Sequence, residues 1–201
     1  KFPTISGSHF ALNGISFWEE FGPSALTAKI RAEGMYNFGP SLSPNNAFYI
    51  LQGIETLSLR MKKHIENTKM MLEFLKENES VSWLRHPDLE DHPDHKIAKK
   101  ILPLGSGSII VFGIKGGRDA GKAFIENVKL SSHLANVGDA KTLLIHPGST
   151  THSHLSSEAM KMSGLTDDMI RLSVGLEDIE DIKIDFEKGF KAAAKISSKR
   201  S

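Results

Sequence analysis

Apolar residues recur every three to four positions along residues 43–78, the period of one face of an α-helix. The residues in this stripe are Ile50, Ile54, Leu57, Met61, Ile65, Leu72 and Leu75. Ser43 is a favoured N-cap and Pro44 is favoured at the first helical position, so we predict that the helix begins there. Running to about Asn78, it would be roughly 50 Å long at a rise of 1.5 Å per residue. A helix of that length typically links two structural units.

Short apolar runs bounded by turn residues replace this pattern beyond residue 105. They predict strands at Gly107–Ile114, Leu130–Ala135, Thr142–His146 and Met169–Val174. Between and after them, helices are predicted at Arg118–Asn127, Ser156–Ser163 and Asp178–Ile196. Strands interspersed with helices in this way favour an α/β sandwich, with one sheet and its helices on one face. The segment His86–His95 is predicted to be a loop.

Residues 1–42 differ in composition, being rich in Gly, Pro, Ser and aromatic residues around one helix-like patch at Ser24–Glu33. The large apolar residues here are Phe2, Phe10, Phe17, Trp18 and Phe21. They are too many for a disordered tail, so we expect them to cover a surface. The first residue is Lys1 rather than Met, which we interpret as the mark of a fragment or a processed chain.

Composition narrows the function classes without selecting one. The content of 39% hydrophobic and 24% charged residues over 201 positions is ordinary for a globular protein. A net charge of +1 without a basic run argues against a nucleic-acid partner. No apolar stretch has the length of a membrane span, and no signal-peptide pattern stands at the N-terminus. The absence of cysteine excludes disulfides and thiolate chemistry and suits a cytoplasmic protein.

Two histidine-rich segments raise the question of a metal site. They contain His86, His92 and His95, and then His146, His152 and His154. The first spacing matches neither a helical histidine pair nor a calcium loop, and no carboxylate accompanies the second at a familiar spacing. We therefore predict a solvated, charged loop, structural histidines, and no metal site. The glycine-serine run at 105–108 leads into a strand, whereas a phosphate-binding loop leads into a helix.

One arginine lies within an apolar, strand-like run. The neighbours of Arg171 are Met169, Ile170, Leu172 and Val174, which predict a largely buried strand. A guanidinium stays charged when it is buried and therefore needs an anionic partner. That partner is either an internal carboxylate, for example Asp139 or Glu177, or the carboxylate of a ligand, to which the planar fork of arginine is well suited. Spacing alone leaves both alternatives open.

Four segments in order carry a family resemblance. They are Leu42–Pro44, Gln52–Met61, Gly138–His152 and Ile170–Asp178. The first two resemble the long interdomain helix, and the last two the C-terminal signature, of the Cys/Met-metabolism family of pyridoxal-phosphate (PLP) enzymes. The resemblance implies the C-terminal small domain of a PLP fold type I (aspartate-aminotransferase-like) enzyme, an α/β fold with a mixed sheet and helices on one face. It also implies three parts: a large-domain remnant at 1–42, an interdomain helix at 43–78 and an α/β domain at 79–201.

Details resemble the O-acetylhomoserine sulfhydrylase branch of that family. Gln-Gly-Ile-Glu-Thr-Leu at 52–57 replaces the Arg-Gly-x-Lys-Thr-Leu type common in the lyases, and Ser-Thr-Thr-His at 149–152 replaces Ser-Met-Thr-His. Asn136 stands where many relatives have serine. Gly148, where alanine is usual, and Asn45, where phenylalanine is usual, depart from the pattern outside the expected carboxylate site.

The resemblance implies a γ-replacement, in which acetate leaves O-acetylhomoserine and sulfide takes its place to give homocysteine, with PLP as the electron sink. By position, Arg171 matches the residue that clamps the substrate α-carboxylate. Asn136 matches a position that contacts the same carboxylate, and Thr151 is a weaker candidate beside it. The alternatives are a cystathionine γ-synthase, a methionine γ-lyase, or a non-catalytic carboxylate-binding module.

The Schiff-base lysine of this family lies in a Ser-x-Thr-Lys type of motif, and no lysine here has that context. We therefore expect PLP to be bound mainly by residues upstream of this chain, which would contain no catalytic or cofactor-binding residue and would be inactive alone. The resemblance further implies a small amino-acid substrate and a homo-oligomer, typically a tetramer. Neither a nucleic-acid nor a membrane partner is expected.

Overall fold

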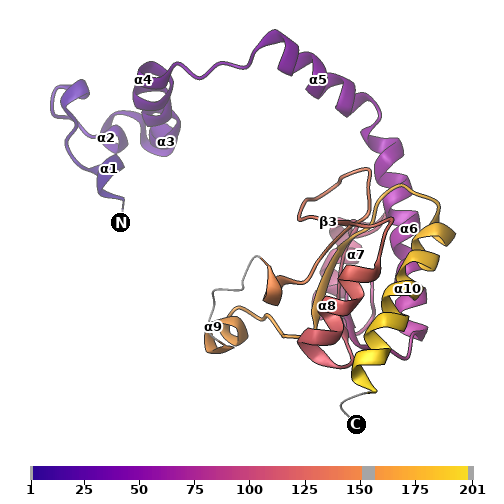
Figure 1. Cartoon of the computed structure of the whole chain (residues 1–201). Helices are drawn as coiled ribbons and strands as arrows, with labels where there is room; N and C mark the ends of the chain where they lie inside the picture. Colours follow the sequence, from indigo (N-terminus) through magenta and orange to yellow (C-terminus); the bar gives the residue numbers. More distant parts are fainter. Residues whose placement is uncertain (1, 151–156, 199–201) are drawn as a thin grey trace. The chain divides into compact units, whose positions relative to one another are not determined.

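The computed structural model describes residues 2–150 and 157–198 and divides the chain into two compact units, Lys1–Ile54 and Glu55–Ser201 (Figure 1). The division lies beside Thr56, inside the segment predicted as one helix. There the structure has two helices, α5 (Pro44–Glu55) and α6 (Leu57–Glu77), so the prediction of one unbroken helix is wrong. Thr56 has φ −103° and ψ 3°, which is not helical. Gly53 and the β-branched Thr56 both lower helix propensity at this point.

The first unit consists of short helices. They are α1 (Pro3–Ser6), η1 (Phe10–Leu12), α2 (Phe17–Phe21), η2 (Gly22–Ser24), α3 (Ala25–Lys29), the π-helical η3 (Ile30–Met35), α4 (Tyr36–Phe38) and α5. The predicted helical patch at Ser24–Glu33 is confirmed by α3 and η3. A capping box begins α2, because Ser16 and Glu19 each bond the backbone N–H of the other. Of the aromatic residues singled out in the sequence, Phe17 is buried, while Phe10 is 90% exposed.

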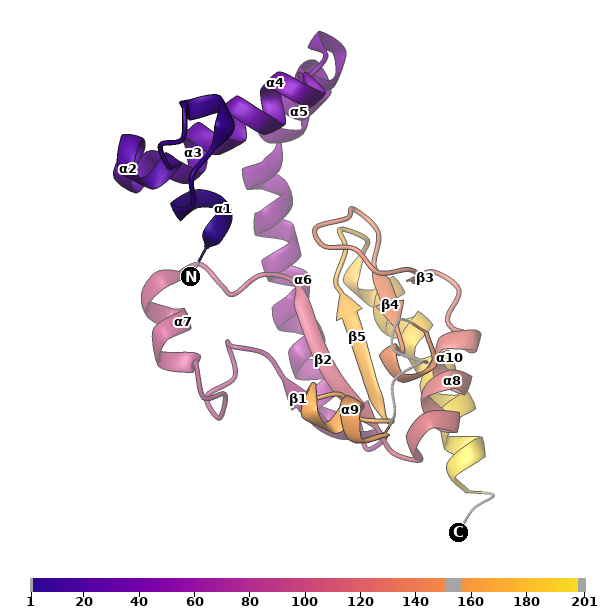
Figure 2. The same cartoon turned by 90° about the vertical axis from the view of Figure 1, so that its left-hand side faces the viewer.

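The second unit is built on a five-stranded sheet in the order β1-β2-β5-β4-β3. Its strands are β1 (Val81–Arg85), β2 (Ile109–Ile114), β3 (Ser132–His133), β4 (Leu143–Ile145) and β5 (Met169–Ser173). The β3–β4 pair is parallel, and the other three pairs are antiparallel. The predicted mixed sheet is therefore confirmed, and Figure 2 shows β2, β5 and β4 side by side.

Three helices cover one face of this sheet (Figure 1). They are α6, α8 (Gly117–Asn127) and α10 (Ile179–Ser197). Alternate residues of the two central strands pack against them, namely Ile110, Phe112 and Ile114 of β2 and Ile170 and Leu172 of β5. The core is closed by Phe124 of α8 and Phe186 and Phe190 of α10, with ring centroids 4.9–6.3 Å apart. The predicted helices on one face are thus confirmed.

Two further elements lie where no strand or helix was predicted. Strand β1 precedes the loop that begins at His86, and α7 (His95–Ile101) begins at its last residue. The helix predicted at Ser156–Ser163 corresponds to α9 (Ser157–Met162). Within the described residues, no helix combines the length and the hydropathy that a membrane span requires.

Candidate functional site

Arg171 lies at the middle of β5, paired with Val111 of β2 on one side and with Ile145 of β4 on the other. Its chain neighbours Ile170 and Leu172 point into the helix-covered core. Because successive side chains of a strand alternate between faces, Arg171 points to the opposite face of the sheet. Its side chain is half-buried there, whereas the other residues of β5 are buried, so the predicted largely buried strand is confirmed.

Within the described part of the chain, no carboxylate pairs with Arg171. Among the described residues it makes one hydrogen bond, from Nη2 to the backbone oxygen of Asn136 at 3.3 Å. Asp139 instead accepts from the backbone N–H of Lys141 at 3.0 Å. Glu177 accepts from the backbone N–H and the hydroxyl of Thr142, at 2.7 and 2.8 Å. The salt bridges considered in the sequence, to Asp139 or to Glu177, are therefore not formed.

Asn136 contacts Arg171 through its backbone rather than through its amide. The amide oxygen accepts from the N–H of Val137 at 2.9 Å, and the amide nitrogen lies 3.4 Å from the carboxylate of Asp139. The structure thus brings two of the three predicted substrate-binding residues together. The third, Thr151, lies outside the described residues.

A buried polar network anchors the end of β5, just beyond Arg171, to helix α6. The ring of His64 donates through Nδ1 to the carbonyl of Val174 at 2.7 Å. The amide of Asn67 donates to the carbonyls of Gly175 and Glu177 at 3.0 and 2.9 Å. Three positions apart on a helix, His64 and Asn67 share one face. Sequence reasoning missed this pair, although a polar His-x-x-Asn beside the apolar stripe of α6 was a usable signal.

His146 holds two loops together next to the site. Its Nε2 donates to the carbonyl of Asp167 at 2.8 Å, and its Nδ1 accepts from the hydroxyl of Ser149 at 2.9 Å. Burial disfavours the charged ring and lowers the pKa of His146 below its ordinary value. Both nitrogens are thus used within the fold, as expected of a structural histidine. His152 and His154 lie outside the described residues.

The histidines of the other segment each fix a local turn. Nδ1 of His86 accepts from the N–H of Asp88, and Nδ1 of His92 accepts from the N–H of Asp94, both at 3.1 Å. The ring of His95 donates through Nδ1 to the carbonyl of Pro87 at 2.9 Å. Burial lowers the pKa of His86. Residues 2–150 and 157–198 contain no cluster of three His, Asp or Glu side chains suited to holding a metal ion.

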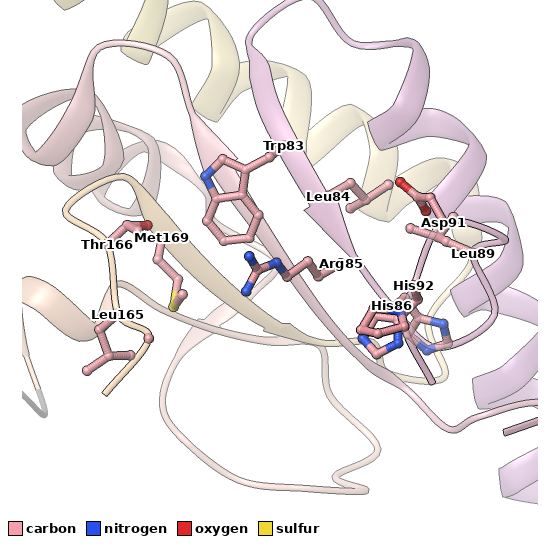
Figure 3. Close-up of a pocket in the computed structure, with 12 residues that line it drawn as sticks. Trp83, Leu84, Arg85, His86, Leu89, Asp91, His92, Leu165, Thr166 and Met169 are labelled. Carbon is pink, nitrogen blue, oxygen red and sulfur yellow. The ribbon is translucent and has the colours of Figure 1, made fainter. Parts of the chain in front are cut away.

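A cleft of about 790 Å³ lies beside β1 and the segment that leads into β5 (Figure 3). Its lining residues include Trp83, Arg85, His92, Leu165 and Met169. Met169 is two residues from Arg171 on the same strand, so the two side chains share a face of the sheet.

The described residues do not by themselves make a covalent PLP site. A Schiff-base lysine is activated by desolvation or by a neighbouring cation, yet no lysine whose side chain is described is buried. The glycine-serine run at 105–108 leads into β2, so it does not offer a helix N-terminus to a phosphate group. What these residues offer is a fork-shaped cation, the guanidinium of Arg171, on an accessible face of the sheet.

Comparison with known proteins places these features in one family. Residues 5–191 match the profile of the Cys/Met metabolism PLP-dependent enzymes. The chain is 43% identical over 188 residues to O-acetyl-L-homoserine sulfhydrylase 1 of Thermus thermophilus, covering 94% of this chain and 45% of that protein. It is 42% identical over 193 residues to homocysteine synthase of Schizosaccharomyces pombe, covering 96% and 45%.

Solved structures of proteins named as enzymes of this kind also resemble the chain. A Campylobacter jejuni protein, described as a candidate O-acetylhomoserine (thiol)-lyase and containing a pyridoxyl-lysine, matches with a TM-score of 0.78 at 29% identity, over 94% of this chain and 45% of that one. Cystathionine γ-synthase of Xanthomonas oryzae matches with a TM-score of 0.71 at 32% identity, over 79% and 41%. The chain thus spans about 45% of the length of the curated relatives it matches. The chain belongs to the family of Cys/Met metabolism PLP-dependent enzymes.

Proposed function

We propose that this chain is the C-terminal part of a PLP-dependent O-acetylhomoserine sulfhydrylase, which replaces the acetate of O-acetylhomoserine by sulfide to give homocysteine. The observation that carries the proposal is Arg171, an arginine on an accessible sheet face without a carboxylate partner among the described residues. Identities of 42–43% to proteins named sulfhydrylase and homocysteine synthase support the reaction.

In this proposal Arg171 binds the substrate α-carboxylate. A guanidinium makes two parallel charge-assisted hydrogen bonds to a carboxylate, which fix the orientation of the amino acid as well as its position. Within residues 2–150 and 157–198 Arg171 makes a single hydrogen bond, of 3.3 Å to a backbone oxygen, which uses one of its five N–H groups. Asn136 and Thr151 are the other proposed substrate contacts, and the carbonyl of Asn136 also orients the guanidinium.

The cofactor of the family is PLP, and we propose that the lysine which binds it lies outside these 201 residues. The chain would then contribute the substrate clamp, while PLP supplies the electron sink of the reaction. Division into a large-domain remnant, an interdomain helix and a C-terminal domain, a cytoplasmic location and a tetrameric assembly belong to the same proposal. Treating the chain with PLP and then borohydride should leave no single lysine stoichiometrically modified, and one such lysine would contradict this step.

The clamp is tested in the complete protein that carries this chain. Arg171→Lys keeps the charge but loses the bidentate geometry, so kcat/KM for O-acetylhomoserine should fall at least about tenfold, which corresponds to 1.4 kcal/mol. Arg118→Lys, on the exposed surface of α8, is the matched control and should leave kcat/KM unchanged. Equal kinetics for the two variants would reject the clamp.

A second candidate is a cystathionine γ-synthase, favoured by the structural match at 32% identity. The two activities differ in the nucleophile. Initial rates with sulfide and with cysteine would separate them, since a cystathionine γ-synthase prefers the amino-acid thiol. A third measurement, without any added nucleophile, would reveal a γ-lyase, which turns over under that condition.

A further inference from the structure

A second arginine lies in the same cross-strand row as Arg171. In the antiparallel register, Arg85 of β1 pairs with Val111 of β2, and Val111 pairs with Arg171 of β5. Directly paired residues of a sheet point to the same face. Two strand spacings place the two arginine Cα atoms about 10 Å apart. The preceding row, in which Leu84 pairs with Phe112, faces the helix-covered core, as alternation requires.

Arg85 has no carboxylate within ion-pair distance in the part of the chain that the structure describes. Its side chain is exposed and lies over the ring of Trp83, with the guanidinium carbon 5.5 Å from the ring centroid (Figure 3). The indole of Trp83 is itself held in place, because its Nε1 donates to Asp168 at 2.9 Å. Stacking of this kind limits the freedom of a guanidinium while leaving its N–H groups free to donate.

The described groups around the two arginines favour the binding of an anionic ligand, because none of them supplies a carboxylate to either guanidinium. Val111, between the two arginines, is half-buried and uncharged. The nearby carboxylate of Asp168 is occupied by Ser82 and Trp83, both at 2.9 Å. Asp91 lines the same cleft as Arg85 without forming an ion pair with it.

We propose that Arg85 and Arg171 together bind a ligand with two carboxylates, one at each end. This rests on the proposed function, in which Arg171 takes the α-carboxylate, and it adds Arg85 as the residue that recognises a second, distal carboxylate. Neither acetate nor sulfide carries such a group, so the second carboxylate belongs either to a longer acyl group in place of acetyl or to an amino-acid thiol in place of sulfide. Arg85 is thus a determinant of substrate class, and the cleft beside it holds the distal end of the ligand.

The test uses the full 201-residue chain with Trp18→Phe, which leaves Trp83 as the only tryptophan and a fluorescent reporter next to Arg85. Glutarate, with two carboxylates, is titrated in parallel with butyrate, which has one. Arg85→Gln and Arg171→Gln are compared with the parent, and isothermal titration calorimetry checks each affinity independently of Trp83. Lys122→Gln, an exposed cation on α8, is the matched control for lost charge.

The proposal predicts that each arginine variant weakens glutarate binding about twofold to fivefold, the range of exposed ion pairs. Butyrate should respond to Arg171→Gln alone. Glutarate binding that depends on Arg171 but not on Arg85 would overturn this inference and leave the proposed function intact. Dependence on Arg85 but not on Arg171 would also overturn it, and would count against the clamp as well. Indifference to both substitutions would reject both proposals.

The two sources of the second carboxylate are distinguished by two more titrations. O-succinylhomoserine carries it on the acyl group, and cystathionine carries it beyond the sulfur. The one whose affinity falls on Arg85→Gln identifies the source, and O-acetylhomoserine, with its single carboxylate, should be unaffected. If neither two-carboxylate amino acid responds to Arg85→Gln, Arg85 is not a determinant of substrate class.

Discussion

Thr142 tests whether the end of β5 is held by its polar network. Its hydroxyl donates to the carboxylate of Glu177 at 2.8 Å and accepts from the backbone N–H of Gly175 at 2.9 Å, in a fully buried position. Thr142→Val is nearly isosteric and removes both bonds. Losing a hydrogen bond to a charged group costs about 1.5–3 kcal/mol, and a buried N–H left unpaired costs about 1–3 kcal/mol. We therefore expect the free energy of unfolding to fall by about 3–5 kcal/mol, a large part of the total for a domain.

Urea denaturation followed by far-UV circular dichroism measures this change. Thr166→Val is the matched control, because Thr166 is exposed and its hydroxyl has no hydrogen bond within the described residues. Its stability should change by less than about 0.5 kcal/mol. A loss for Thr142→Val no larger than that of the control would mean that the network does not stabilise the strand that carries Arg171.

Three further perturbations probe the core and the buried histidines. Burial lowers the pKa of both His86 and His146, so their stabilising contribution is full above the unfolded pKa of about 6.5 and is lost as the pH falls toward the folded values. The midpoint of thermal unfolding should therefore fall as the pH is lowered from 7.5. His146→Gln should make that midpoint depend less on pH. Phe124→Ala empties a fully buried site among aromatic rings, so the free energy of unfolding measured in urea should fall by about 3–5 kcal/mol. An equally large fall on substituting an exposed residue by alanine would indicate global misfolding instead. Gly121→Ala would place a Cβ 2.9 Å from the ring of His146 and should cost about 1–3 kcal/mol, with an unchanged midpoint contradicting the tight packing.

The elements that the sequence predicted correctly are those with a strong local pattern. Strand β5 is the central strand and β2 lies directly beside it, so their residues are largely apolar and bounded by glycine or by polar turns. Helix α10 begins at an Asp178 N-cap, whose carboxylate accepts from the N–H of Glu180 at 2.9 Å. In both cases the signal lies within the segment itself, which is why it could be read without the rest of the fold.

The elements that were missed depend on context. Strand β1 is an edge strand with an irregular register between Val81 and Trp83, so its side chains do not alternate cleanly between apolar and polar. Helix α7 is short and leaves Ile97 and Ile101 exposed, and it therefore lacks a complete amphipathic stripe. The break at Thr56 is a single non-helical residue within an otherwise continuous apolar period.

In the candidate site, too, local features could be predicted from the sequence and features that depend on packing could not. The sequence identified Arg171 as a charged residue in a strand, and the family resemblance gave it a role. The face of β5 on which it lies could not be predicted, because that face is decided by the packing of Ile170 and Leu172 against the helices. Nor could its proximity to Arg85, since the two are far apart in the chain and meet only through the register with Val111.

The two arginines and the buried network therefore have separable effects. Two like charges separated by as much as their Cα atoms, about 10 Å, repel in water by roughly 0.4 kcal/mol, and salt screens most of that, because this distance is close to the Debye length. Replacing Arg85 should thus leave the free energy of unfolding nearly unchanged while it alters the binding of two-carboxylate ligands. Replacing Thr142 should lower the free energy of unfolding several times more than any change at Arg85. If Arg85→Gln destabilised the chain as strongly as Thr142→Val, the arginine would be part of the scaffold, and weaker ligand binding could no longer be attributed to a lost contact.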